Sequence, residues 1–151
     1  MNRQMDNVRK VRTFLLAQLD DLSSEQLNRI PDGFNNNIIW NIGHMIAAQQ
    51  GICYIRAGVP PVVEEQLILN YKPGTKPAKS INDEEVTHLK SLLLSTLDQM
   101  EADLEGQLFD GYKSWTIRYG VEITNIDEAI DILLFHEGYH QGAILALKKL
   151  V

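Results

Sequence analysis

Two histidines four residues apart are the residues of this sequence best suited to chemistry. They are His136 and His140, in the segment His136-Glu137-Gly138-Tyr139-His140. Residues four apart lie on one face of a helix with Cβ atoms about 5–6 Å apart, so both imidazoles can reach one metal ion. The segment also matches the H-E-x-x-H pattern of zinc metalloproteases, in which the glutamate is the general base. The spacing therefore indicates a metal site. A zincin-type protease is one function that such a site could have.

A third ligand has to come from upstream. The eleven residues after His140 contain no histidine, aspartate or glutamate, whereas zincin-type sites usually take their third ligand from later in the chain. His44 is the better of the two remaining histidines, because Trp40 lies one turn before it on the same helix face. His88 is out of step with the apolar stripe around it and is expected to face solvent. We therefore predict a metal site formed by His44, His136 and His140.

Three histidines suit a divalent first-row metal, with zinc or nickel expected first and iron or manganese as alternatives. The remaining coordination position would be open to water or substrate. A metal there could lower the pKa of a bound water for hydrolysis or hold a substrate thiolate. Glu137 projects about 100° away from His136 around the helix, so a supporting or surface role is expected rather than that of general base. The aromatic side chains near the ligands, Trp40, Tyr54 and Tyr139, are expected to belong to the core.

Four amphipathic segments would position these side chains. Apolar residues recur at three- and four-residue intervals over about 3–22, 37–57, 83–106 and 126–149. The first stripe is expected to contain Val8, Val11, Phe14, Leu15 and Leu19. Between the segments we expect a helical turn near 25–29, a long loop over 58–79 with a turn near residue 65, and an ordered loop over 107–123 without a partner strand.

Ser80 and Thr124 each precede an aspartate by three residues, which predicts that they cap the third and fourth helices. The predicted fold is all-α, an up-down four-helix bundle formed by a single domain over residues 1–151. In such bundles, inward side chains of facing helices form the site.

Composition excludes several classes of partner. Acidic residues outnumber basic ones by 20 to 14, so the net charge of −6 disfavours nucleic acid. No run approaches the roughly 20 apolar residues that span a bilayer, so no membrane association is expected. The amino terminus lacks a secretory signal, so a cytoplasmic location is expected. The single cysteine, Cys53, is expected to be a buried small hydrophobe rather than a reactive thiol.

Two motifs resemble those of the DinB-like superfamily. The stretch Trp40-Asn41-Ile42-Gly43-His44 is similar to the second-helix signature of that family, and the stretch from His136 to Ile144 is similar to its fourth-helix motif. The resemblance implies a four-helix bundle, usually a homodimer, with a metal bound by His44, His136 and His140. In many relatives an arginine follows the second histidine of the fourth helix, whereas this chain has Gln141, so any role of that arginine is not carried over.

Relatives of this kind include thiol-dependent transferases that use bacillithiol, mycothiol or glutathione, and proteins described as metal-dependent hydrolases. The first hypothesis is therefore a metal-dependent enzyme acting on a small molecule, either a thiol S-transferase or a hydrolase. A low-molecular-weight thiol would be one of its substrates. The alternative is a non-catalytic metal-binding or stress-responsive protein, and a zincin-type metalloprotease ranks third.

Overall fold

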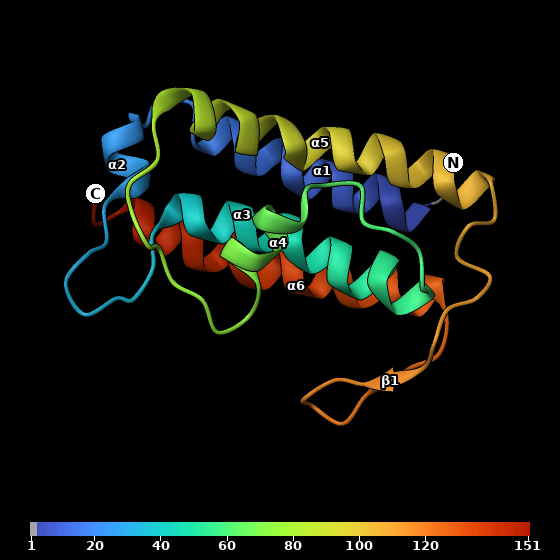
Figure 1. The fold of residues 1–151 in the computed structure, drawn as a ribbon. Coiled ribbons are helices and arrows are strands. Elements are labelled where there is room, and N and C mark those ends of the chain that lie inside the picture. Colours follow the sequence, from blue (N-terminus) through green and yellow to red (C-terminus); the bar gives the residue numbers. More distant parts are fainter. Residues whose placement is uncertain (1–2) are drawn as a thin grey trace.

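The computed structural model describes residues 3–151 and is built mainly from long helices that lie side by side (Figure 1). The long helices are α1 (Arg3–Gln18), α3 (Ile38–Gln49), α5 (Asp83–Glu105) and α6 (Ile126–Lys148), and α3 continues into a π-helical segment, η1 (Gln50–Ile55). The shorter elements are α2 (Ser24–Asn28), α4 (Glu65–Tyr71), β1 (Trp115–Thr116) and β2 (Glu122–Ile123). The expected all-helical class is confirmed, and α2 and α4 are the two short turns that the sequence predicted. None of the described helices is long and apolar enough to cross a bilayer.

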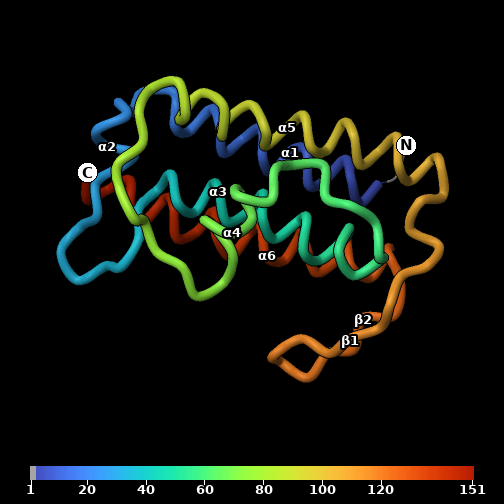
Figure 2. Tube along the Cα trace, viewed as in Figure 1, coloured from blue at the N-terminus to red at the C-terminus, as the bar shows by residue number. Residues whose placement is uncertain are grey.

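The four long helices pack in a closed arrangement. Both α1 and α3 contact α5 and α6. The chain runs in one direction in α1 and α6 and in the opposite direction in α3 and α5 (Figures 1 and 2). The order therefore differs from the expected up-down succession, because the segment 58–82 carries the chain back along the molecule before α5 begins. Helix α4 lies within this segment and packs against α3.

Asparagines cap the helices that carry the site and its neighbours. The Asn37 side chain accepts a hydrogen bond from the backbone amide of Trp40, and Asn82 and Asn125 cap α5 and α6 in the same way. Asparagine and serine are about equally good caps. The predicted caps at Ser80 and Thr124 are therefore wrong by two residues and one residue, because an asparagine lies nearer to each helix start.

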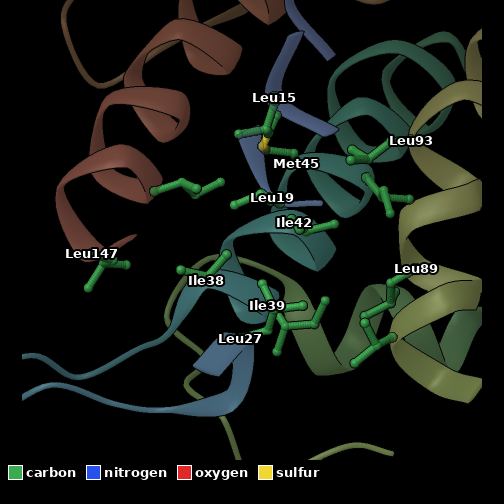
Figure 3. Close-up of a cluster of buried hydrophobic side chains, with 13 residues drawn as sticks. Leu15, Leu19, Leu27, Ile38, Ile39, Ile42, Met45, Leu89, Leu93 and Leu147 are labelled. Carbon is green, nitrogen blue, oxygen red and sulfur yellow. The ribbon is translucent and has the colours of Figure 1, made fainter. Parts of the chain in front are cut away.

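The buried side chains form two hydrophobic clusters with a polar layer between them. One cluster lies toward the carboxyl end of α1 and contains Leu15, Ile42 and Leu93 (Figure 3). The other lies toward the amino end of α1 and includes Met5 and Cys53, which is fully buried as expected. The polar layer takes one residue from each long helix, and all four are at most 3% exposed: Arg12, Gln49, Thr96 and Glu137.

Hydrogen bonds join the four members of the polar layer. Arg12 forms an ion pair with Glu137 at 2.7 Å, and its other terminal nitrogen donates to the Gln49 side chain at 2.9 Å. The hydroxyl of Thr96 donates to the same Gln49 oxygen at 2.8 Å. Charged groups are rarely fully buried unless they are paired, so the helices must be positioned along their axes such that these side chains meet. The network therefore fixes the axial register of the four helices.

The first helix has most of the expected stripe buried: Val8, Leu15 and Leu19 are buried as predicted, and Phe14 is not. Its buried residues include Met5, Val8, Arg12 and Leu15, whereas Phe14 is 51% exposed. The helix also ends at Gln18, four residues before the expected boundary. The prediction was wrong for Phe14 and omitted Arg12 because it preferred apolar residues to a charged one, although Arg12 follows Val8 at the four-residue spacing of a single face.

The region expected to be a loop contains a small hairpin. Strands β1 and β2 pair antiparallel, with Trp115 opposite Ile123 and Thr116 opposite Glu122. Gly120 adopts a positive φ of 81° in the turn, a conformation that glycine reaches without a steric penalty. The expectation of no partner strand is wrong, because the partner lies within the same segment, just beyond this turn.

Candidate metal centre

The structure brings the three predicted ligands together. His44 comes from α3, and His136 and His140 come from α6. Their potential ligand nitrogens all lie within 4.8 Å of one another, and among residues 3–151 this is the one group of histidine, cysteine or carboxylate side chains that could hold a metal ion. The Nε2 atoms of His44 and His136 are 3.2 Å apart. Imidazoles from two facing helices therefore converge on one point.

The outer nitrogen of His44 has a backbone partner. Its Nδ1 lies 2.7 Å from the carbonyl oxygen of Tyr71 at the end of α4. A carbonyl only accepts hydrogen bonds, so Nδ1 carries the proton and donates it. In the neutral ring, Nε2 then presents its lone pair toward the other histidines, which is the form that binds a metal.

Asn41 has the same effect on His140. The His140 Nδ1 lies 2.8 Å from the Asn41 side-chain oxygen. The orientation of that amide is set on its other side, where its nitrogen donates to the Asn37 carbonyl at 2.8 Å and to the Asn36 side chain at 3.3 Å. His140 therefore donates from Nδ1 and directs the Nε2 lone pair inward.

The third ligand, His136, lacks such a partner. Its Nδ1 is buried without a hydrogen bond in the structure, and its ring lies 4.4 Å from that of His140 and 5.1 Å from that of His44, centroid to centroid. His136 therefore differs from His140, whose Nδ1 has a partner from α3.

Burial keeps the three imidazoles neutral. It lowers the pKa of His44 below its ordinary value, and together with the neighbouring histidines it lowers the pKa of His136 to about 3 and that of His140 to about 4. A neutral imidazole is the form that binds a metal. Two fixed lone pairs directed at one point form an electron-rich position that a cation would occupy. The donor set therefore fits a divalent metal ion.

A glycine and two aromatic residues shape the α3 side of the site. Trp40 stacks on His44, with ring centroids 4.9 Å apart and an angle of 11° between the planes, and its indole donates to Thr75. A Cβ atom at Gly43 would lie 2.5 Å from the Tyr71 ring, so only glycine lets α4 approach α3 this closely. The Trp40-x-x-Gly43-His44 pattern thus places an aromatic against the ligand and makes room for the helix that orients it.

The other candidates lie outside the cluster. Glu137 is fully buried and points toward α1, where Arg12 binds it, so it supports the fold and is not placed as a general base. His88 is exposed on α5, as expected. Tyr54 belongs to the core and donates to Asp103 at 2.6 Å, whereas Tyr139 is 58% exposed and was wrongly expected to be buried.

The sequence argument missed Asn41 and the Tyr71 carbonyl. The signal for Asn41 was available, because it is a polar residue in an apolar helix, three residues before His44. No comparable signal existed for Tyr71, because a backbone carbonyl is not tied to a residue type and its position depends on how α4 packs against α3.

The fold and site together define a helical protein with a three-histidine centre between α3 and α6. The family model of the DinB superfamily matches residues 7–144 of the chain. The chain belongs to this superfamily, and the resemblance of its second- and fourth-helix motifs is confirmed. A comparison with curated proteins gave no match.

Proposed function

We propose that this protein is a metal-dependent enzyme acting on small molecules, with thiol S-transfer as its reaction. His44, His136 and His140 would hold one divalent ion, zinc or nickel before iron or manganese. The observation that carries the proposal is the convergence of three neutral imidazoles, two of them oriented by Tyr71 and Asn41. Three protein ligands leave a coordination position for a substrate atom.

The surroundings of the site favour a thiol over a water molecule as nucleophile. No carboxylate of the described residues joins the cluster, and Glu137 is engaged by Arg12. The site therefore offers no carboxylate base for water, whereas a thiol loses its proton far more readily. A bound divalent ion would supply Lewis acidity that stabilises a thiolate. In the transfer, the sulfur forms a bond to an electrophilic carbon, the leaving group departs with its electron pair, and the thiol proton passes to solvent.

Metal content tests the site itself. We expect about one divalent metal per chain in purified protein by elemental analysis, and a loss of most of it in His44→Ala, His136→Ala or His140→Ala. His88→Ala is the matched control, because this histidine is exposed and distant in the sequence from the cluster. Undiminished metal in the three variants would contradict the site.

Thiol conjugation tests the reaction. Zinc- or nickel-loaded protein is mixed with 1-chloro-2,4-dinitrobenzene and, in separate assays, glutathione, cysteine or 2-mercaptoethanol. We expect release of chloride and formation of the thioether above the uncatalysed rate, with loss of the acceleration in His140→Ala. Hydrolysis of nitrophenyl esters without conjugation would favour the hydrolase, and stoichiometric metal with neither activity would favour the non-catalytic metal-binding alternative.

We also propose that the protein is a homodimer, as the resemblance to its family implies. Light scattering coupled to size-exclusion chromatography measures this directly, and a mass of one chain at micromolar concentration would contradict it. Proteolysis is not expected, since Glu137 is held by Arg12 away from the histidines.

A further inference from the structure

The hairpin between α5 and α6 is held firmly at its base. The Tyr112 hydroxyl donates to the backbone oxygen of Ile52 at 2.8 Å and accepts from the Trp115 indole at 2.9 Å. The guanidinium of Arg56 lies over the Trp115 ring, 4.4 Å from its centroid. These contacts tie β1 to the end of η1, and the hairpin turn points back toward the middle of α6 (Figures 1 and 2).

The hairpin turn carries Arg118 beside the two metal-ligand positions of α6. The Tyr119 ring packs edge-on against Phe135, with centroids 6.2 Å apart, and Phe135 directly precedes His136. Arg118 donates to the Tyr119 hydroxyl at 2.5 Å, lies over the same ring at 4.8 Å and also interacts with the side chain of Tyr139. The guanidinium is thus held by Tyr119, which packs against the residue before His136, and by Tyr139, the residue before His140.

Tyr139 links this cluster to the metal centre. Its ring contacts that of His140 edge-on, with centroids 5.3 Å apart. The positive charge of Arg118 also makes a small contribution to the lowered pKa of the His136 imidazole, after burial, the other histidines and Arg12. The arginine therefore lies near the metal centre, on the side where Tyr139 contacts His140.

Arg118 has no carboxylate partner among the described residues. It takes part in none of the ion pairs found over residues 3–151, and the groups that act on it are tyrosines. This is notable in a chain with 20 acidic and 14 basic residues. A guanidinium presents a planar set of donors that matches a carboxylate, and here two tyrosine hydroxyls lie next to it.

We propose that Arg118 binds a carboxylate of the small molecule whose reactive end reaches the three-histidine centre. The substrate class is then an anionic small molecule, a mercaptocarboxylate in the case of the thiol. This inference rests on the proposed metal-dependent function. It assigns to the hairpin the recognition of the substrate's negative charge, which the neutral histidines cannot provide. The positive charge comes from the segment before α6, whereas the residue after His140 is the uncharged Gln141.

Paired thiols that differ only in charge test this assignment. Cobalt-loaded protein is titrated with ω-mercaptocarboxylates of two to six carbons and with the mercaptoalcohols of the same length, and the thiolate-to-cobalt absorption is followed. At the best chain length we expect the acid to bind about tenfold more tightly than the alcohol, as a charge-assisted hydrogen bond allows. In Arg118→Gln the preference should disappear while the affinity for the alcohol is unchanged.

The matched control is Lys113→Gln, which removes one exposed positive charge from the same connecting segment but outside the aromatic cluster. It should keep the preference for the acid. An acid preference that survives in Arg118→Gln, or that is absent from the wild-type protein at every length, overturns the proposal.

A second measurement separates this proposal from the proposed function. If no thiol changes the cobalt spectrum, thiol binding at the metal is contradicted, and the role of Arg118 is decided without metal. Metal-free protein is then titrated with hexanoate while the Nε–H signal of Arg118 is followed by NMR, with hexanol as the neutral control. A saturable shift with hexanoate alone supports the carboxylate site, and no saturable shift overturns it.

Discussion

A single asparagine decides which nitrogen of His140 faces the centre. We expect Asn41→Leu, which removes the acceptor but keeps the size, to weaken zinc binding by roughly 10- to 100-fold, the usual effect of losing such an outer partner. Competition with a chromophoric chelator measures the affinity. Asn7→Leu, at an exposed position of α1, is the control and should bind zinc like the wild type. Equal affinities for the two variants would remove Asn41 from the site.

The buried ion pair makes a different prediction for Glu137. Removing one partner leaves the other charge buried and unpaired, so Glu137→Leu should lower the free energy of unfolding by about 3–5 kcal/mol. The double variant Arg12→Met with Glu137→Leu should recover most of this loss, because no charge is then stranded. Urea unfolding of metal-free protein measures both. A glutamate acting as a general base would instead leave stability almost unchanged when replaced.

For individual residues, the sequence predicted which residue types form the site better than it predicted their hydrogen-bond and ion-pair partners. The three histidines were predicted because two of them have four-residue spacing and the third follows Trp40 on one helix face. Arg12 and Glu137 were missed because charged residues are rarely fully buried, although each continues the buried stripe of its own helix. Only the packing of α1 against α6 shows that the two charges meet.

Among the elements, the contact between α4 and α3 depends on the absence of a side chain at Gly43. We expect Gly43→Ala to push the Tyr71 ring and α4 away, because the added Cβ would lie 2.5 Å from that ring. His44 would then lose the carbonyl that orients it, so both the melting temperature and zinc affinity should fall. Calorimetry and chelator competition measure the two effects.

The control for this variant is another helical glycine with free space around it. A Cβ at Gly142 meets nothing within 4 Å, so Gly142→Ala should raise helix stability by up to about 1 kcal/mol. If Gly43→Ala were also stabilising, α4 would have no part in holding the site.

Helix periodicity predicted the long helices well, and their ends less well. The hairpin could not be recognised, because strands of two residues show no alternation and their pairing depends on the turn at Gly120. The π-helical segment η1 also has no sequence signal that separates it from the helix it continues. These elements are set by contacts with distant segments, such as the bond from Tyr112 to Ile52.

For the whole molecule, metal binding and folding should be linked. An ion that binds the folded chain alone stabilises it by about 4 kcal/mol when its concentration is 1,000 times the dissociation constant. We expect zinc to raise the melting temperature, EDTA to reverse the rise, and His140→Ala to show neither effect. Differential scanning calorimetry measures all three, and an unchanged wild-type melting temperature would show that zinc does not bind the native state selectively.

The direction of the helices is the part of the architecture that the sequence did not determine. Helix number and order follow from the apolar stripes, but the long segment 58–82 allows either an antiparallel or a parallel third helix. The structure shows the parallel choice, with α3 and α5 running the same way (Figure 1).

His44 and His136 lie 92 positions apart in the chain, on α3 and α6. An ion held by both would join the ends of a loop that contains α4, α5 and the hairpin. A disulfide across such a loop would restrict the unfolded chain permanently, whereas an ion bound only by the folded chain stabilises it to an extent set by the free metal concentration. The chain has one cysteine, and it is buried. The ion would thus act as a reversible cross-link of the folded chain, present when metal is available and absent when the metal is withdrawn.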